Sequence, residues 1–188
     1  MKLAMQIDMD IKSLKNYFGK LFKLLDESKL EEANFKPVTY DSDSSEYGSP
    51  HLQFSHLIKP DMLANIYSLV DYYSKQICDG KKVSKCLNLS SKDIKGDNDL
   101  NARYKYLTKY AGLDLESVKN SYDHLNFVRE IRNQLVHKGG HVVDEKIITK
   151  IKLSSGVQLF GSLILIEEQF IWDSLDHADK FLKYTSEG

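Results

Sequence analysis

Apolar residues recur at every third or fourth position through most of this chain, which places them on one face of an α-helix. The spacing predicts five helices, over residues 8–33, 60–80, 98–110, 115–137 and 167–184. Pro60 suits the first turn of the second helix, because a backbone N–H has no intrahelical partner there. Gly80, Gly112 and the pair Gly139-Gly140 follow helical segments and are typical helix terminators.

Two segments interrupt the helical spacing. Residues 36–58 open with Pro37, a run of aspartate and serine from 41 to 45, and Gly48-Ser49-Pro50, which predicts a long exposed loop. A loop of this length either covers a site or is a mobile insertion. Residues 146–166 hold two apolar runs around Ser154-Ser155-Gly156, which predicts a β-hairpin with Gly156 in its turn.

These elements predict a mainly α fold. Consecutive helices with one apolar stripe each form an antiparallel bundle most simply, and the hairpin would be inserted before the C-terminal helix. The 188 residues suit one domain, spanning 1–188, with its own hydrophobic core.

Composition narrows the class of protein. The 26 basic and 27 acidic residues nearly balance, so any nucleic-acid site must be local. Cys78 and Cys86 lack a second pair of metal ligands, and neither a zinc site, a disulfide scaffold nor a cofactor is indicated. Asp8 and Asp10 fall where the apolar region of a signal peptide would have to lie, so no signal peptide is expected. The apolar cluster 163–166 is too short to cross a bilayer. We therefore expect a cytoplasmic protein without a membrane partner.

The chemistry concentrates at residues 127–140, near the end of the fourth predicted helix. Only three of the 26 basic residues are arginines, and two of them, Arg129 and Arg132, lie one helical turn apart here. Arginine is the side chain suited to bidentate contact with phosphate or carboxylate. At about 100° per residue, one side of this helix holds Arg129, Arg132, Asn133 and Val136 with His137 at its margin, and the other holds Phe127, Val128, Ile131 and Leu135.

Arginine and histidine together meet the needs of metal-free RNA cleavage. Histidine exchanges protons near neutrality, and arginine stabilises charge on phosphate. Because Arg132 and His137 are about 140° apart around the helix, they flank a surface that a symmetry-related helix could complete. A two-fold dimer would supply the second histidine that an in-line displacement needs, and Val136 and Leu125 would add apolar contact. Alternatively, the arginine and histidine only cap the last carbonyls of their helix.

The sequence from Ile131 to Gly140, IRNQLVHKGG, resembles the signature of the HEPN superfamily (higher eukaryotes and prokaryotes nucleotide-binding domains). In that signature an arginine is followed by a polar residue and, four to six residues after the arginine, by a histidine. By resemblance Arg132, Asn133 and His137 are the catalytic residues. Arg129, one turn earlier, is expected to bind the phosphate of the substrate or to pair across the dimer. The resemblance covers about ten residues and the order of helices.

The resemblance implies a homodimeric helical bundle that cleaves RNA without a metal. Such proteins act in toxin-antitoxin or anti-phage systems, so an antitoxin or defence-system protein is an expected partner besides RNA. Some members keep the fold without cleavage, and the alternative is an inactive dimer that binds nucleotide, RNA or a partner protein. Members paired with a nucleotidyltransferase antitoxin often carry a tyrosine where this chain has Gly139, so modification of that type is not expected.

Roles are also predicted for several residues outside the motif. Glu130 is expected to be a solvated surface residue, His124 a structural histidine and Trp172 a core residue. Tyr72 and Tyr73 either stack on a base or belong to the packed core.

Overall fold

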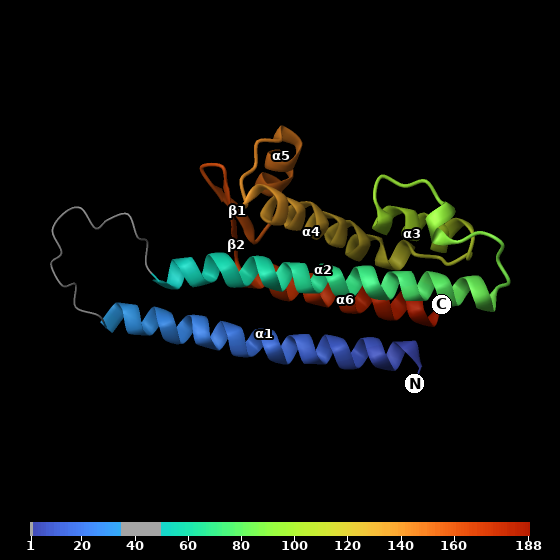
Figure 1. Cartoon of the computed structure of the whole chain (residues 1–188), viewed down its shortest axis with the longest axis horizontal. Helices are drawn as coiled ribbons and strands as arrows, with labels where there is room; N and C mark the ends of the chain where they lie inside the picture. The colour runs from blue at the N-terminus through green and yellow to red at the C-terminus, as the bar shows by residue number, and fades with distance from the viewer. Residues whose placement is uncertain (1, 35–49) are drawn as a thin grey trace.

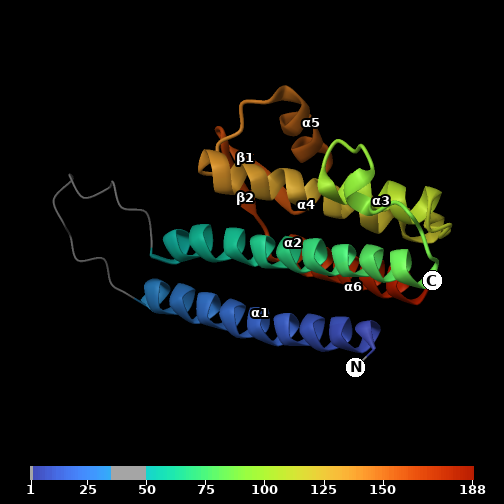
Figure 2. The same cartoon turned by 45° about the vertical axis from the view of Figure 1, so that its right-hand side comes forward.

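Four long helices lie side by side, and the two longest of them extend along most of the length of the described structure (Figures 1 and 2). The computed structural model describes residues 2–34 and 50–188. Within these residues the helices are α1 (Leu3–Asn34), α2 (Pro50–Ser84), α3 (Asp99–Lys109), α4 (Lys119–Lys138), α5 (Glu145–Leu153) and α6 (Glu168–Glu187). Two short 3-10 turns, η1 (Ser91–Asp93) and η2 (Glu116–Val118), precede α3 and α4, and strands β1 (Val157–Phe160) and β2 (Leu163–Ile166) precede α6. The predicted mainly α bundle, with a hairpin before its last helix, is confirmed.

The bundle is centred on α6, which packs against α1, α2 and α4. In Figure 1, α2 and α6 run in one direction, and α1 and α4 run in the other. Most neighbours are therefore antiparallel, as predicted, whereas α2 and α6 are parallel. The short helix α3 lies at the end of the bundle that holds the C-terminus, and α5 and the hairpin lie at the opposite end of α4 (Figure 1).

One hydrophobic core joins the four long helices. Its largest fully buried side chains include Tyr73, Phe18, Phe181, Ile66 and Leu63. Trp172 is half-buried, and its ring packs against that of Phe22 with 5.4 Å between centroids. Its predicted place in the core is therefore confirmed, and it lies at the margin of that core. Burial of aromatic and aliphatic side chains of this size contributes about 1.5–3 kcal/mol each.

Helix α2 begins ten residues before the predicted start, and the predicted loop is wrong over residues 50–58. Residues 51–59 contain neither glycine nor proline, so nothing in their backbone opposes the helix. Pro60 lies inside α2, where it removes one backbone hydrogen bond. Lys59 compensates in part, because its half-buried ammonium donates to the carbonyl of Ile166 at 2.9 Å and ties α2 to the hairpin. The rest of the predicted loop, 36–49, lies outside the described residues.

The hairpin is shorter than predicted. Residues 145–153 form α5 instead of a first strand, with Asp144 accepting a hydrogen bond from the backbone of Lys146 as the N-cap. The antiparallel strands β1 and β2 pair Val157 with Ile166 and Phe160 with Leu163, so the turn is at Gly161-Ser162 and not at Gly156. Apolar residues at 147, 148 and 151 fit a helical stripe as well as a strand, which explains the error.

The hairpin is attached directly to the end of α4. The amide of Ile164 donates to the carbonyl of Gly140 at 3.0 Å, and the amide of Val142 donates to the carbonyl of Ser162 at 2.8 Å. His141 and Leu163 form an isolated antiparallel bridge between them. The segment that follows α4 therefore pairs with β2 and fixes the hairpin beside the helix end.

None of the helices in the described ranges combines the length and the apolar character that a membrane-spanning segment requires.

Gly156 provides a test of how tightly the hairpin packs on α6. Its φ is +79°, and a Cβ there would meet the Cβ of Phe170 at 2.8 Å. Gly156→Ala is expected to lower the free energy of unfolding by about 2–4 kcal/mol, because the strained backbone adds to a clash that the helix cannot relieve. The measurement is urea-induced unfolding followed by circular dichroism.

Gly161→Ala is the matched control, because Gly161 has a φ of +61° and nothing within 4 Å of the added Cβ. Only the backbone strain applies there, so the expected loss is about 1 kcal/mol. Equal losses in the two variants would show that Gly156 is not packed closely against Phe170.

Candidate functional site

The candidate site lies in the last two turns of α4. This helix ends at Lys138 because Gly139 adopts the left-handed conformation, with φ +58°, which glycine accepts without steric cost. The amides of Gly139 and Gly140 both donate to the carbonyl of Gln134. Backbone amides therefore cap this carbonyl, and no hydrogen bond from Arg132 or His137 to a helix carbonyl is present in the described residues.

The three residues of the predicted motif differ in their surroundings. Arg132 is half-buried, and its Nη1 donates to Oδ1 of the adjacent Asn133 at 3.2 Å. Its Nε is buried and has no hydrogen-bond partner among the residues that the structure describes. His137 is exposed and likewise has no partner within residues 2–34 and 50–188. The helix thus brings Arg132 and Asn133 into contact and leaves the histidine free.

Gln134, which no sequence motif indicates, lies beside the motif residues. It is 7% exposed, and its Oε1 has no hydrogen-bond partner in the described part of the chain. Buried polar atoms are nearly always paired in folded proteins. Two unpaired ones, on Arg132 and Gln134, therefore distinguish this end of α4 from the rest of the helix.

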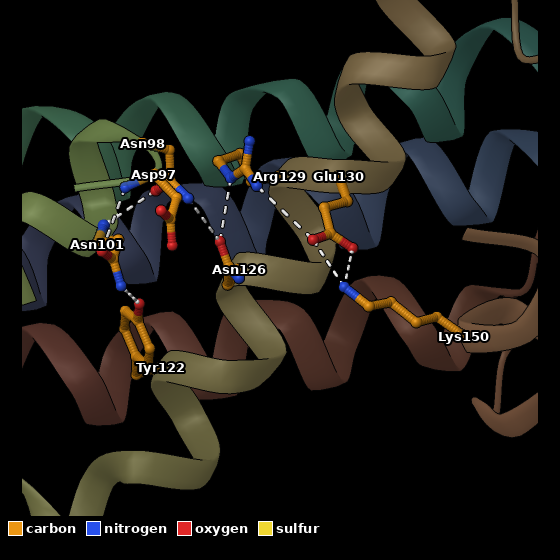
Figure 3. A network of polar contacts seen from close by, with 8 residues as sticks. All are labelled: Asp97, Asn98, Asn101, Tyr122, Asn126, Arg129, Glu130 and Lys150. Atoms are coloured by element: carbon orange, nitrogen blue, oxygen red, sulfur yellow. Dashed lines mark hydrogen bonds and ion pairs between the residues drawn. The ribbon is translucent and has the colours of Figure 1, made fainter. Parts of the chain in front are cut away.

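Arg129 belongs to a polar network that joins α3, α4 and α5 (Figure 3). Its Nε donates to Oδ1 of Asn126 at 3.1 Å, and Asn98 of the α3 N-cap donates to the same oxygen at 3.2 Å. Its Nη2 lies 3.7 Å from Oε1 of Glu130. Arg129 is therefore bonded to residues of the same chain, and its predicted part in substrate binding or dimer pairing stays a prediction.

Glu130 is not the solvated surface residue predicted from the sequence. Its side chain is 17% exposed, and both carboxylate oxygens accept hydrogen bonds from Nζ of Lys150, at 2.8 and 2.6 Å. Lys150 lies on α5, which the sequence analysis expected to be a strand (Figure 3). The ion pair was missed because helix α5 was not predicted, and without it nothing in the sequence places residue 150 next to residue 130.

Leu125 cannot supply the predicted apolar contact for a dimer. It is fully buried within the protomer, with 0% of its surface exposed, because it faces the core side of α4. Val136, by contrast, is 52% exposed in the last turn of α4. Of the two apolar residues proposed for an interface, only Val136 is accessible.

Two other histidines have structural partners. Nε2 of His124 lies 2.9 Å from Oγ of Ser174, which confirms its predicted structural role. Its ring stacks on that of His177, with 4.3 Å between centroids. His141 is exposed, and its Nδ1 lies 2.8 Å from Oγ of Ser162 in the hairpin turn. Of the histidines near this end of α4, His137 is therefore the one whose ring has no hydrogen-bond partner among the described residues.

The tyrosine pair of α2 is divided between core and surface. Tyr73 is 1% exposed, and its hydroxyl donates to Oδ2 of Asp10 at 2.5 Å, which links α2 to α1. Tyr72 is exposed and meets the ring of Tyr73 edge-on. Tyr73 therefore belongs to the packed core, and it is not available to stack on a base.

Comparisons of the chain with protein-family models, with curated proteins and with solved structures find no match. The resemblance to HEPN proteins therefore depends on the residues between 131 and 140 and on the helical architecture around them.

The histidine pair predicts an acid-sensitive fold. Burial, together with the neighbouring His177 and against the opposite effect of Asp173, lowers the pKa of His124 to about 4. Because the folded state binds the proton less well than the unfolded chain, stability is complete above about pH 6.5 and falls as pH drops toward 4. The expected loss at pH 4 is on the order of 2 kcal/mol, measured by urea unfolding at a series of pH values.

His124→Gln is the control for this titration. Glutamine retains an N–H donor toward Ser174, whose own hydroxyl donates to the carbonyl of Phe170 at 2.6 Å, but it does not ionise. The difference in stability between wild type and variant should change between pH 6.5 and pH 4 and be constant above pH 7. A difference that does not depend on pH would show that His124 titrates normally.

Proposed function

We propose that this chain is a metal-independent endoribonuclease of the HEPN type that acts as a homodimer. The observation that carries the proposal is the state of His137, which is exposed, without a hydrogen-bond partner in the described residues, and not used to cap its helix. A histidine with only a structural role would be expected to have a partner, as His124 does.

The proposed reaction uses groups that stabilise charge and exchange protons. A base removes the proton of a 2′-hydroxyl, and this oxygen attacks the adjacent phosphorus as the bond to the 5′-oxygen breaks. An acid donates a proton to the leaving 5′-oxygen, so the products carry a 2′,3′-cyclic phosphate and a 5′-hydroxyl. His137 is assigned to one of the two proton transfers, and His137 of the second copy is assigned to the other.

Arg132 is assigned to the scissile phosphate. Its guanidinium carries a permanent charge, and its Nη2 is not fully buried and has no hydrogen-bond partner in the described chain, so this donor is available without breaking an existing bond. Asn133 accepts from Nη1 of Arg132 and so positions the guanidinium. Charge on the phosphate oxygens rises in the transition state, where a fixed cation is most effective.

The role in a toxin-antitoxin or anti-phage system is proposed by the same resemblance. An antitoxin or another defence-system protein is the partner expected to restrain or activate cleavage.

The first test is cleavage of total RNA by purified protein in excess EDTA, with analysis of the fragment ends. Wild type is expected to leave 2′,3′-cyclic phosphates, and His137→Ala is expected to lower the rate by about 100-fold or more, because general acid-base catalysis contributes about that much. His141→Ala is the matched control, since His141 is an exposed histidine four residues away that is bonded to Ser162.

Equal rates for wild type and His137→Ala would exclude His137 from the reaction. Absence of cleavage by a dimeric wild-type protein, with RNA binding retained, would favour the inactive binding dimer instead.

The second test concerns the dimer. Val136→Glu places a charge at the exposed apolar position beside the motif, and it is expected to convert the dimer to a monomer and to reduce cleavage by at least about tenfold with His137 intact. Light scattering coupled to size exclusion measures the mass. Val143→Glu, at a residue that is 77% exposed outside α4, is the control and should leave mass and cleavage unchanged. A dimeric, fully active Val136→Glu protein would rule out an interface at this part of α4.

A further inference from the structure

A small cavity lies between α2, η1 and α3, at the end of the bundle remote from α5 and the hairpin (Figure 1). Its volume is about 200 Å³. Basic and polar side chains form most of its wall: the lining residues are Lys75, Ser91, Lys92, Asp99, Ala102 and Arg103. Arg103 is the one arginine of the sequence outside α4, and the proposed ribonuclease reaction does not use it.

Arg103 is held rigidly on one side of its guanidinium. The residue is 8% exposed, and its Nη1 donates to the carbonyl of Asp71 at 2.9 Å, to Oδ1 of Asp71 at 2.6 Å and to Oγ of Ser74 at 3.0 Å. Three acceptors at one nitrogen leave the side chain little freedom to turn. The guanidinium therefore presents a fixed edge to the cavity.

That edge consists of Nε and Nη2. Neither nitrogen has a hydrogen-bond partner among the described residues, and neither is one of their fully buried unpaired atoms, so each keeps some contact with solvent on a residue that lines the cavity. Nε and Nη2 are the parallel donors with which arginine binds two oxygens of a phosphate or carboxylate. The ion pair with Asp71 uses the other end of the guanidinium and does not obstruct them.

The cavity lining carries more positive than negative charge, and two of its cations, Arg103 and Lys75, are also paired with carboxylates outside the lining. Lys92 is exposed and has no ion-pair partner in the described part of the chain. Lys75 pairs with Asp79 one turn along α2, at a half-exposed position where such pairs are weak and readily exchanged. Asp99 is the single carboxylate of the lining, against three cations.

We propose that this cavity binds a phosphate group, with Nε and Nη2 of Arg103 as the bidentate donors and Lys92 and Lys75 as the neutralising cations. The volume is below the roughly 300–1,000 Å³ typical of sites for whole ligands of drug size, so the site takes one group and not an entire nucleotide. The phosphate is either free or terminal on a nucleotide, or it belongs to the backbone of an RNA strand; both present at least two non-bridging oxygens to the guanidinium.

The sequence offers a direct probe, because three arginines give three side-chain Nε–H signals in a ¹⁵N–¹H spectrum. Titration of the full chain with inorganic phosphate, at constant ionic strength with chloride, is expected to shift the Arg103 signal with saturation in the millimolar range. The indole N–H signal of Trp172, which donates to Glu168 on α6 outside both sites, is the internal reference and should not shift with it. Absence of a saturable shift at Arg103, or a similar shift with chloride alone, would overturn the proposal.

Lys92→Glu tests the site without disturbing the core, because Lys92 is exposed. It is expected to raise the dissociation constant for phosphate about fivefold or more. Lys20→Glu, the same change of charge at an exposed position of α1, should alter it less than about twofold. Equal effects of the two variants would show that phosphate binds by general electrostatic attraction, and this result would overturn the assigned site.

The source of the phosphate is distinguished by a second titration with a 2′-O-methyl oligoribonucleotide that has hydroxyl ends. This probe has backbone diesters but lacks the 2′-hydroxyl that cleavage requires. A saturable shift of Arg103 at a lower concentration than with inorganic phosphate assigns the site to the RNA backbone, and the reverse order assigns it to free or terminal phosphate. Because the readout is binding at Arg103, it is independent of whether His137 catalyses cleavage.

Discussion

The close packing of α6 against three other helices is the constraint on which the rest of the structure depends. Its buried positions recur with helical spacing: Phe170, Ile171, Ser174, Leu175, Ala178, Phe181, Leu182 and Thr185. The two polar members of this set are compatible with the core because Ser174 and Thr185 donate to carbonyls of their own helix. Ser174 also contacts His124 of α4. Its hydroxyl therefore forms a hydrogen bond within α6 and orients a side chain of the neighbouring helix. The polar side of α4 is directed away from α6 as a result.

Much of the fold could be predicted from apolar spacing, because long amphipathic helices repeat the same signal many times. The prediction was wrong where the signal is short or ambiguous. Ile147, Ile148 and Ile151 are β-branched residues that favour strands, yet Asp144 caps a helix that contains them. Pro60 is a frequent first-turn residue, and only the packing of α2 shows that the helix continues through it. In both cases tertiary packing outweighs the local conformational preference of the residues.

The candidate site could be predicted in part. Arg132, Asn133 and His137 lie within six residues, and helix geometry alone fixes how they are placed on α4. Contacts between distant segments could not be predicted in this way. Lys150 reaches Glu130 only because α5 forms and lies beside α4, and Arg103 is fixed by Asp71, which is 32 residues away in sequence. A single sequence carries no signal for either pair.

The pairing of the hairpin with the segment after α4 affects the order of the helix end. The last turn of a helix is usually the first part to fray, because its carbonyls lack partners and its backbone opens with little loss of packing. Here that turn carries His137, and the two residues that cap it continue directly into backbone hydrogen bonds with residues 162–164. His137 therefore lies on a helix terminus whose conformational entropy is limited by backbone hydrogen bonds to a strand that is distant in sequence.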